Sequence, residues 1–156
     1  MNPVVSIVKH IGWLASSVVL LSACATAPVQ EMSNARQSVQ VAREVGAGEY
    51  AVYNLQTANE YLARAERELE LRYFSRARHD AIVAKSEARK AHEVAVALQQ
   101  AQAALADSEA DEESLARARA LLSEAMEAAR AGRDRQATRL AREAERRAGA
   151  TAAVDD

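Results

Sequence analysis

The chain has 156 residues, enough for one domain, and its 20 basic and 22 acidic residues nearly balance. That balance argues against a nucleic-acid-binding protein, whose affinity depends on an excess of Lys and Arg facing phosphates. Aromatic residues make up only 4% of the chain, and there are five glycines and two prolines. This composition disfavours a β-sheet. It predicts an all-α fold of antiparallel helical hairpins, an elongated helical bundle with coiled-coil character.

Residues 1–23 form a predicted export signal. Their apolar run, Ile11 to Leu21, is shorter than the roughly 20 residues that a transmembrane helix needs. The run ends at Leu21-Ser22-Ala23-Cys24, which resembles the lipobox of bacterial lipoproteins. Two alternatives stay open: an N-terminal membrane anchor that is never cleaved, and an ordinary secretory signal cut after Ala23.

The lipobox resemblance implies cleavage between Ala23 and Cys24 and attachment of lipid to the Cys24 sulfur. Several acyl chains anchor a protein far more firmly than one. The residue after the cysteine is Ala25 rather than aspartate, which in enterobacterial sorting implies transfer to the outer membrane. We therefore expect a lipidated tether over residues 24–28 and a domain that faces the periplasm. Apart from this covalent lipid, no cofactor is expected.

Apolar stripes at helical spacing predict five helices in a domain spanning residues 29–148. They cover about residues 29–45, 50–72, 75–106, 113–131 and 134–148. The first carries Met32, Ala35, Val39 and Ala42 on one face, and glycines at 46 and 48 end it. The tail, residues 149–156, has no periodicity and is expected to be disordered.

The third predicted helix has alanine or leucine every seven residues, from Ala77 to Leu105, as in a coiled coil. An acidic stretch follows at residues 107–113, with Ser108 and Asp111 as a candidate capping box. We place a turn there. No Gly or Pro interrupts the chain between these helices, so one continuous helix over residues 75–131 stays open.

A shift of 60 residues superposes the stripes of two predicted hairpins. The matched positions are Leu55, Ala58, Leu62 and Ala65 with Leu115, Ala118, Leu122 and Ala125, followed by Ala77, Ala81, Ala84 and Ala88 with Ala137, Ala141, Ala144 and Ala148. Each hairpin is about 34 residues long, the length of a tetratricopeptide repeat. Alanine-rich helices match one another easily, so descent from a duplicated unit and chance similarity both stay open.

Three short motifs follow the lipobox: Met32-Ser33-Asn34-Ala35-Arg36, Gly46-Ala47-Gly48-Glu49-Tyr50-Ala51, and Leu55-x-x-Ala58-x-x-x-Leu62. Together they resemble an uncharacterised family of short bacterial lipoproteins, the domain of unknown function 4398. The resemblance implies a periplasm-facing helical domain. No catalytic residues are known for that family, so none can be assigned from it.

No catalytic or metal-binding motif is found in the sequence. His79 and His92 lie thirteen residues apart, and neither belongs to a Glu-x-x-His motif. The signal cysteine is consumed by lipid in this interpretation, so no thiol nucleophile remains. We therefore predict that the protein is not an enzyme.

Two residue sets are candidate surfaces. Aromatic residues at positions 50–74 either fill gaps in an alanine-rich core or form an interface: Tyr50, Tyr53, Tyr61, Tyr73 and Phe74. Arginines at spacings of 4, 3 and 4 form one face of the last helix: Arg135, Arg139, Arg142 and Arg146. That face is either merely solvated or contacts anionic lipid or an acidic wall polymer.

These observations predict an outer-membrane lipoprotein whose helical domain is a scaffold or adaptor for an envelope protein or for peptidoglycan. The alternative is a lipid-anchored binding module that holds a small ligand between helices. Membrane contact through the lipid is expected and nucleic acid is not. Heptads of this kind also permit self-association.

Overall fold

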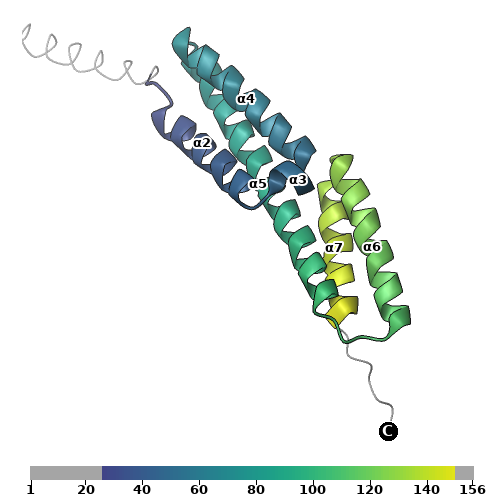
Figure 1. Cartoon of the computed structure of the whole chain (residues 1–156). Helices are drawn as coiled ribbons and strands as arrows, with labels where there is room; N and C mark the ends of the chain where they lie inside the picture. Colours follow the sequence, from purple (N-terminus) through teal and green to yellow (C-terminus); the bar gives the residue numbers. More distant parts are fainter. Residues whose placement is uncertain (1–25, 150–156) are drawn as a thin grey trace, which may run out of the picture.

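A computed structural model describes residues 26–149, which form six helices and no strand. The helices are α2 (Val29–Glu44), α3 (Ala47–Tyr50), α4 (Val52–Glu70), α5 (Phe74–Ala106), α6 (Glu112–Arg130) and α7 (Asp134–Gly149) (Figure 1). The predicted all-α bundle is confirmed. The predicted signal, Cys24 and the last seven residues of the predicted tail lie outside the described residues.

Helix α5 is the spine of the molecule. Its 33 residues correspond to a length of about 50 Å. The first half of α5 packs against α2 and α4, and the second half packs against α7, with α6 on the outside (Figure 1). The chain reverses direction between each long helix and the next, in the order α2, α4, α5, α6 and α7 (Figure 1). Helices α2 and α7 therefore both run parallel to α5. The result is an elongated bundle of two three-helix segments in tandem.

Alanine forms most of the core. The stripe on α2 (Met32, Ala35, Val39 and Ala42) is buried, as its spacing predicts. Alanines of α4 through α7 at the predicted inward positions also have exposures close to zero. Alanine lets helix axes approach closely but buries little apolar area per residue. The fold therefore depends on many small contacts distributed along α5.

The chain does break between α5 and α6, so the continuous helix over residues 75–131 is excluded. Asp111 is the N-cap of α6, and its carboxylate accepts a hydrogen bond of 2.9 Å from the Ser114 amide. The Ser108 side chain has a different role from the predicted capping box. Its hydroxyl donates to the Ala148 carbonyl and so fastens this loop to the end of α7.

A short extra helix, α3, replaces the single break expected around residue 48. Gly46 lies in the left-handed region at φ 73° and ends α2. Helix α3 then runs for four residues until Ala51, at φ −137°, interrupts it ahead of α4. Buried Ala47 and Ala51 hold this turn against the core, a tertiary contact that local spacing does not reveal.

The turns of the two hairpins have the same geometry. Arg72 adopts φ 62° and Gly132, sixty residues later, adopts φ 68°. The following amides bond equivalent carbonyls: Tyr73 N–H donates to Glu68 O at 2.8 Å, and Arg133 N–H donates to Ala128 O at 2.9 Å. The 60-residue match is therefore structural as well as compositional.

The repeat includes a third helix. The buried stripe of α2 has the same 3, 4, 3 spacing as a buried stripe in the second half of α5, at a shift of 59 residues. The latter residues are Ala91, Val94, Leu98 and Ala101. One unit is thus α2, α4 and the first half of α5, and the other is the second half of α5, α6 and α7. The predicted hairpins are present, and each belongs to a three-helix unit that shares α5 with its neighbour.

Candidate functional site

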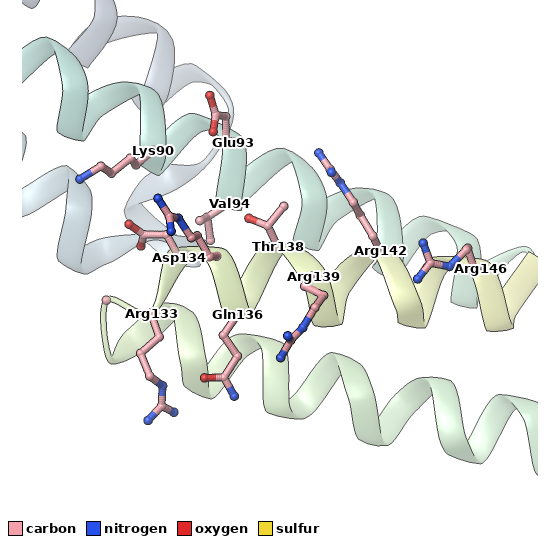
Figure 2. A pocket seen from close by; sticks show the side chains of 12 residues that line it. Lys90, Glu93, Val94, Arg133, Asp134, Gln136, Thr138, Arg139, Arg142 and Arg146 are labelled. Atoms are coloured by element: carbon pink, nitrogen blue, oxygen red, sulfur yellow. The ribbon is translucent and has the colours of Figure 1, made fainter.

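A groove of about 960 Å³ lies along α5 and α7 in the second unit (Figure 2). Its lining is strongly basic, since two carboxylates, Glu93 and Asp134, oppose six cationic side chains. The cations are Lys90, Arg133, Arg135, Arg139, Arg142 and Arg146. We call this feature the basic groove. An excess of positive charge along a concave surface raises the local concentration of anions.

The structure brings all four predicted arginines to the basic groove. Helix α7 buries its alanine stripe on the core, so the flanking positions carry the arginines at the edge of that contact. Arg146 pairs with Glu143 on its own helix. Arg135, Arg139 and Arg142 form no ion pair within residues 26–149. Three guanidinium groups therefore keep their donors available for an external anion.

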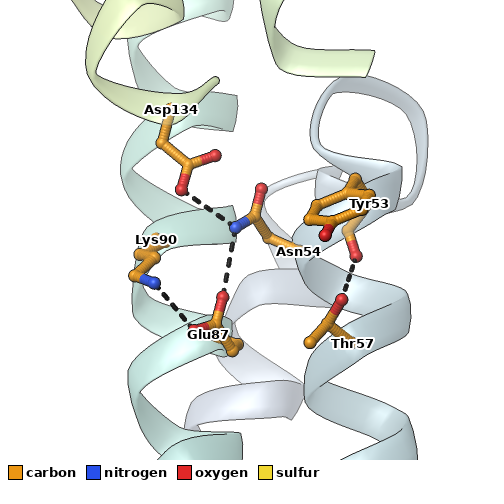
Figure 3. A network of polar contacts seen from close by, with 6 residues as sticks. All are labelled: Tyr53, Asn54, Thr57, Glu87, Lys90 and Asp134. Carbon is orange, nitrogen blue, oxygen red and sulfur yellow. Dashed lines mark hydrogen bonds and ion pairs between the residues drawn. The ribbon is translucent and has the colours of Figure 1, made fainter. Parts of the chain in front are cut away.

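A polar network around buried Asn54 lies where the two units meet (Figure 3), and two of its residues, Lys90 and Asp134, also line the basic groove. Asn54 of α4 is 2% exposed, and its Nδ2 donates to Asp134 Oδ2 at 3.1 Å and to Glu87 Oε2 at 3.3 Å. Lys90 Nζ donates to Glu87 Oε1 at 2.7 Å. The network joins α4, α5 and α7, so it links the two three-helix units.

Burial raises the pKa of the Asp134 carboxyl above its ordinary value, although the Asn54 hydrogen bond and the Lys90 charge act in the opposite direction. The hydrogen bond to Glu87 raises the pKa of Lys90. Sequence reasoning missed this network. The available signal was Asn54, a polar residue beside the apolar stripe of α4, which also lies within that helix's buried face.

A second buried charge joins α4 to α5 within the first unit. The Asp80 carboxylate is 4% exposed, and it accepts two hydrogen bonds from the Arg64 guanidinium, one of them 3.1 Å long. The Arg64 guanidinium also lies 4.4 Å from the centre of the Tyr61 ring. The Asp80 hydrogen bond holds the pKa of Arg64 above its ordinary value. The Asp80 carboxylate is buried, whereas the Arg64 side chain is 49% exposed. Because the pair joins two helices of the bundle, we assign it a structural role.

The aromatic residues do not gather into one surface. Tyr50 donates its hydroxyl to Gln102 Oε1 at 2.8 Å, which ties α3 to α5. Tyr53 and Tyr73 are 54% and 52% exposed, but they lie at opposite ends of α4. The remaining two, Tyr61 and Phe74, are half-buried. The structure therefore supports separate packing roles more than a shared aromatic interface.

Within residues 26–149, no cluster of three or more His, Cys, Asp or Glu side chains is arranged to hold a metal ion. His79 is exposed and His92 is half-buried, both on α5. No helix in the same part of the chain is long and apolar enough to cross a bilayer. The predicted cleavage site and lipidation site, Ala23 and Cys24, lie outside this range.

Residues 30–99 match the model of a protein family described as "Domain of unknown function (DUF4398)". The resemblance seen in the sequence motifs is confirmed over this segment. The match covers nearly all of α2 together with α3, α4 and most of α5, whereas α6 and α7 follow it. The arginine wall of the basic groove therefore lies outside the matched segment. No curated protein and no solved structure matches the chain.

Proposed function

We propose, for a chain whose residues 30–99 match the DUF4398 family model, that it is an outer-membrane lipoprotein acting as a periplasmic scaffold or adaptor. Lipid on Cys24 supplies the anchor, and the two helical units supply an elongated arm. The observation that carries this proposal is that the two halves of the arm differ. Helix α2, the first helix of the described chain, lies in one half of the arm, and α7, which supplies most of the lining of the basic groove, lies in the other half (Figure 1).

The entry point is held firmly to the bundle. Helix α2 begins at Val29, five residues after Cys24. Arg78 of α5 donates to the Thr26 carbonyl at 3.2 Å and to the Glu31 carboxylate at 2.8 Å. A lipid on Cys24 would therefore be attached to the arm through a short tether that is fixed at its base. Such a tether favours a protein that projects a partner-binding surface from the membrane.

The distance between anchor and groove follows from helix geometry. The 16 residues of α2 rise about 24 Å, and they reach only the junction between the two units. The basic groove begins at that junction and continues along α7. An upright arm would place the groove beyond the headgroups of its own membrane, where an envelope protein or the wall could meet it.

Intact-mass spectrometry of protein extracted from membranes tests the anchor. We expect residues 24–156 plus acyl chains, with the protein in the outer-membrane fraction. Cys24→Ala should lose both the acyl mass and the outer-membrane position, whereas Ser33→Ala, at an exposed position on α2, should keep both. A wild-type mass that retains residues 1–23 would replace the lipoprotein with an uncleaved membrane anchor.

In-cell crosslinking of the same sample tests the scaffold role. Crosslinks to an envelope protein or to wall material are expected. Crosslinks to copies of the chain alone would assign self-association instead. If crosslinkers that react with lysines and carboxylates on both units yield no crosslinked species, the scaffold proposal is refuted. The lipid-anchor proposal is unaffected by that result.

A second candidate, a module that holds a small anionic ligand, is supported by the volume and charge of the basic groove. The ligand would bind at the α5–α7 surface, because the spaces between the helix axes are filled by buried alanines. Thermal denaturation with and without citrate tests this candidate. Citrate at millimolar concentration should raise the melting temperature, whereas glucose should not.

A further inference from the structure

We propose that the basic groove binds an extended, carboxylate-bearing wall polymer, with Arg135, Arg139 and Arg142 as its principal contacts. The choice of wall material rests on the proposed periplasmic function. The location of the site rests on the groove itself and on a comparison between the two units of the repeat.

The first unit is an internal control for the arginine stripe. Helix α7 corresponds to the first half of α5 at a shift of 60 residues, with the same buried alanine positions. At the four positions equivalent to the arginines, α5 carries exposed residues of other kinds. They are Ser75, His79, Ile82 and Ser86. The shared three-helix packing forms without arginine there, so the packing does not explain the stripe on α7.

The dimensions and chemistry of the groove favour an extended ligand. From Arg135 to Arg146 the helix rises about 16 Å, longer than one carboxylate or phosphate group. Planar guanidinium groups bind carboxylates with two parallel hydrogen bonds. Gln136 and Thr138 add uncharged hydrogen-bonding groups to the lining, which suits the hydroxyl and amide groups of a glycan with peptide side chains.

Two other polymeric partners fit the lining less well. Its residues, all from the described part of the chain, include no aromatic side chain on which a nucleic-acid base could stack. An amphipathic helix docks through a row of apolar anchors, whereas Val94, the large apolar side chain of this lining, is buried at 1% exposure. A polar, negatively charged strand meets both the charge and the hydrogen-bonding character of the groove.

Sedimentation of the full-length, detergent-extracted protein with isolated peptidoglycan sacculi tests the proposal. The test variant is Arg139→Gln/Arg142→Gln. The matched control is Arg67→Gln/Arg130→Gln, which removes the same charge from exposed positions on α4 and α6. We expect the test variant to bind at least about tenfold more weakly, because it loses two charge-assisted contacts. The control should bind like wild type, and binding should weaken as salt rises.

Several outcomes would overturn the proposal. Failure of the wild-type protein to sediment with sacculi would overturn it. Equal loss of binding in the two double variants would also overturn it, because binding would then depend only on the overall charge of the protein. Stronger binding to vesicles of phosphatidylglycerol than to vesicles of phosphatidylcholine, lost in the test variant and kept in the control, would assign the groove to lipid headgroups. Saturation by millimolar citrate without sacculus binding would assign it to a small anion.

The assay does not depend on acylation, so it separates this inference from the proposed function. Suppose that the protein carries no lipid but that Arg139→Gln/Arg142→Gln abolishes its binding to sacculi. The groove assignment would then stand, and the lipid-anchor proposal would fall. A lipidated chain with no sacculus binding would keep the anchor and lose the groove assignment.

Discussion

The two hairpin turns provide a stability test that depends directly on backbone geometry. Arg72 and Gly132 occupy equivalent turns in the left-handed region, at φ 62° and φ 68°. A residue with a Cβ pays about 1 kcal/mol or more for that conformation, whereas glycine does not. The Arg72 side chain is exposed and forms no ion pair within residues 26–149. Replacing it with glycine should therefore relieve strain at little cost.

We expect Arg72→Gly to raise the free energy of unfolding by about 0.5–1 kcal/mol after allowance for the greater flexibility of glycine in the unfolded chain. For a domain of this size the melting temperature should rise by about 2–4 °C. The reverse change, Gly132→Ala, should destabilise the fold by about 1–2 kcal/mol. Its Cβ would lie 2.6 Å from Cδ1 of Tyr53, in addition to the unfavourable φ.

Urea and thermal denaturation followed by circular dichroism at 222 nm measure both changes. Tyr53→Ala and the double variant Tyr53→Ala/Gly132→Ala separate the steric contact from the backbone strain. If only φ matters, Gly132→Ala will cost the same in both backgrounds. An Arg72→Gly variant that melts at or below the wild-type temperature would refute the reasoning, because it would show that arginine is not strained at this turn.

Three further predictions concern an ion pair to a buried carboxylate, a half-buried carboxylate and a core alanine. Arg64→Ala should lower the free energy of unfolding by about 2–3 kcal/mol, because it leaves the buried Asp80 carboxylate without its cation. In urea denaturation, Arg64→Ala/Asp80→Asn should recover part of that loss. Equal stability of the single and double variants would contradict this explanation. Burial raises the pKa of Asp134 in the folded state, so this group's contribution to stability is largest below the unfolded pKa and falls as pH rises through the folded pKa. Asp134→Asn should therefore gain stability relative to wild type as pH increases from about 4 to 7, and a constant difference across urea titrations in that range would reject the assignment. Ala84→Glu, at a fully buried position on α5, should cost about 3 kcal/mol or more, whereas Ala63→Glu at an exposed position on α4 should melt near the wild-type temperature.

Local sequence signals determine the helices of this protein. Gly46 and Gly132 supply the left-handed conformation that ends a helix, and Asp111 supplies the cap that begins α6. The spacing of alanine and leucine identifies the buried face of each helix before any contact is known. These effects act within one or two turns of the chain, so they can be inferred from the printed sequence.

The sequence does not reveal which helix each buried face packs against. Alanine stripes on different helices are nearly interchangeable, so periodicity indicates that a face is buried but does not indicate against which helix. Only tertiary packing shows that α5 serves both units, and that the stripe of α2 reappears in the second half of α5 at a shift of 59 residues instead of 60.

The basic groove illustrates the same division. The 4, 3, 4 spacing by itself placed four arginines on one face of one helix. The tertiary structure decided that this face borders α5, and it brought in Lys90 and Glu93 from that helix. It also buried Asn54 at the junction of three helices and separated the tyrosines that lie close together in sequence. The physical reason is that helix periodicity is a local property of the backbone, whereas a groove exists only where two separate helices pack together.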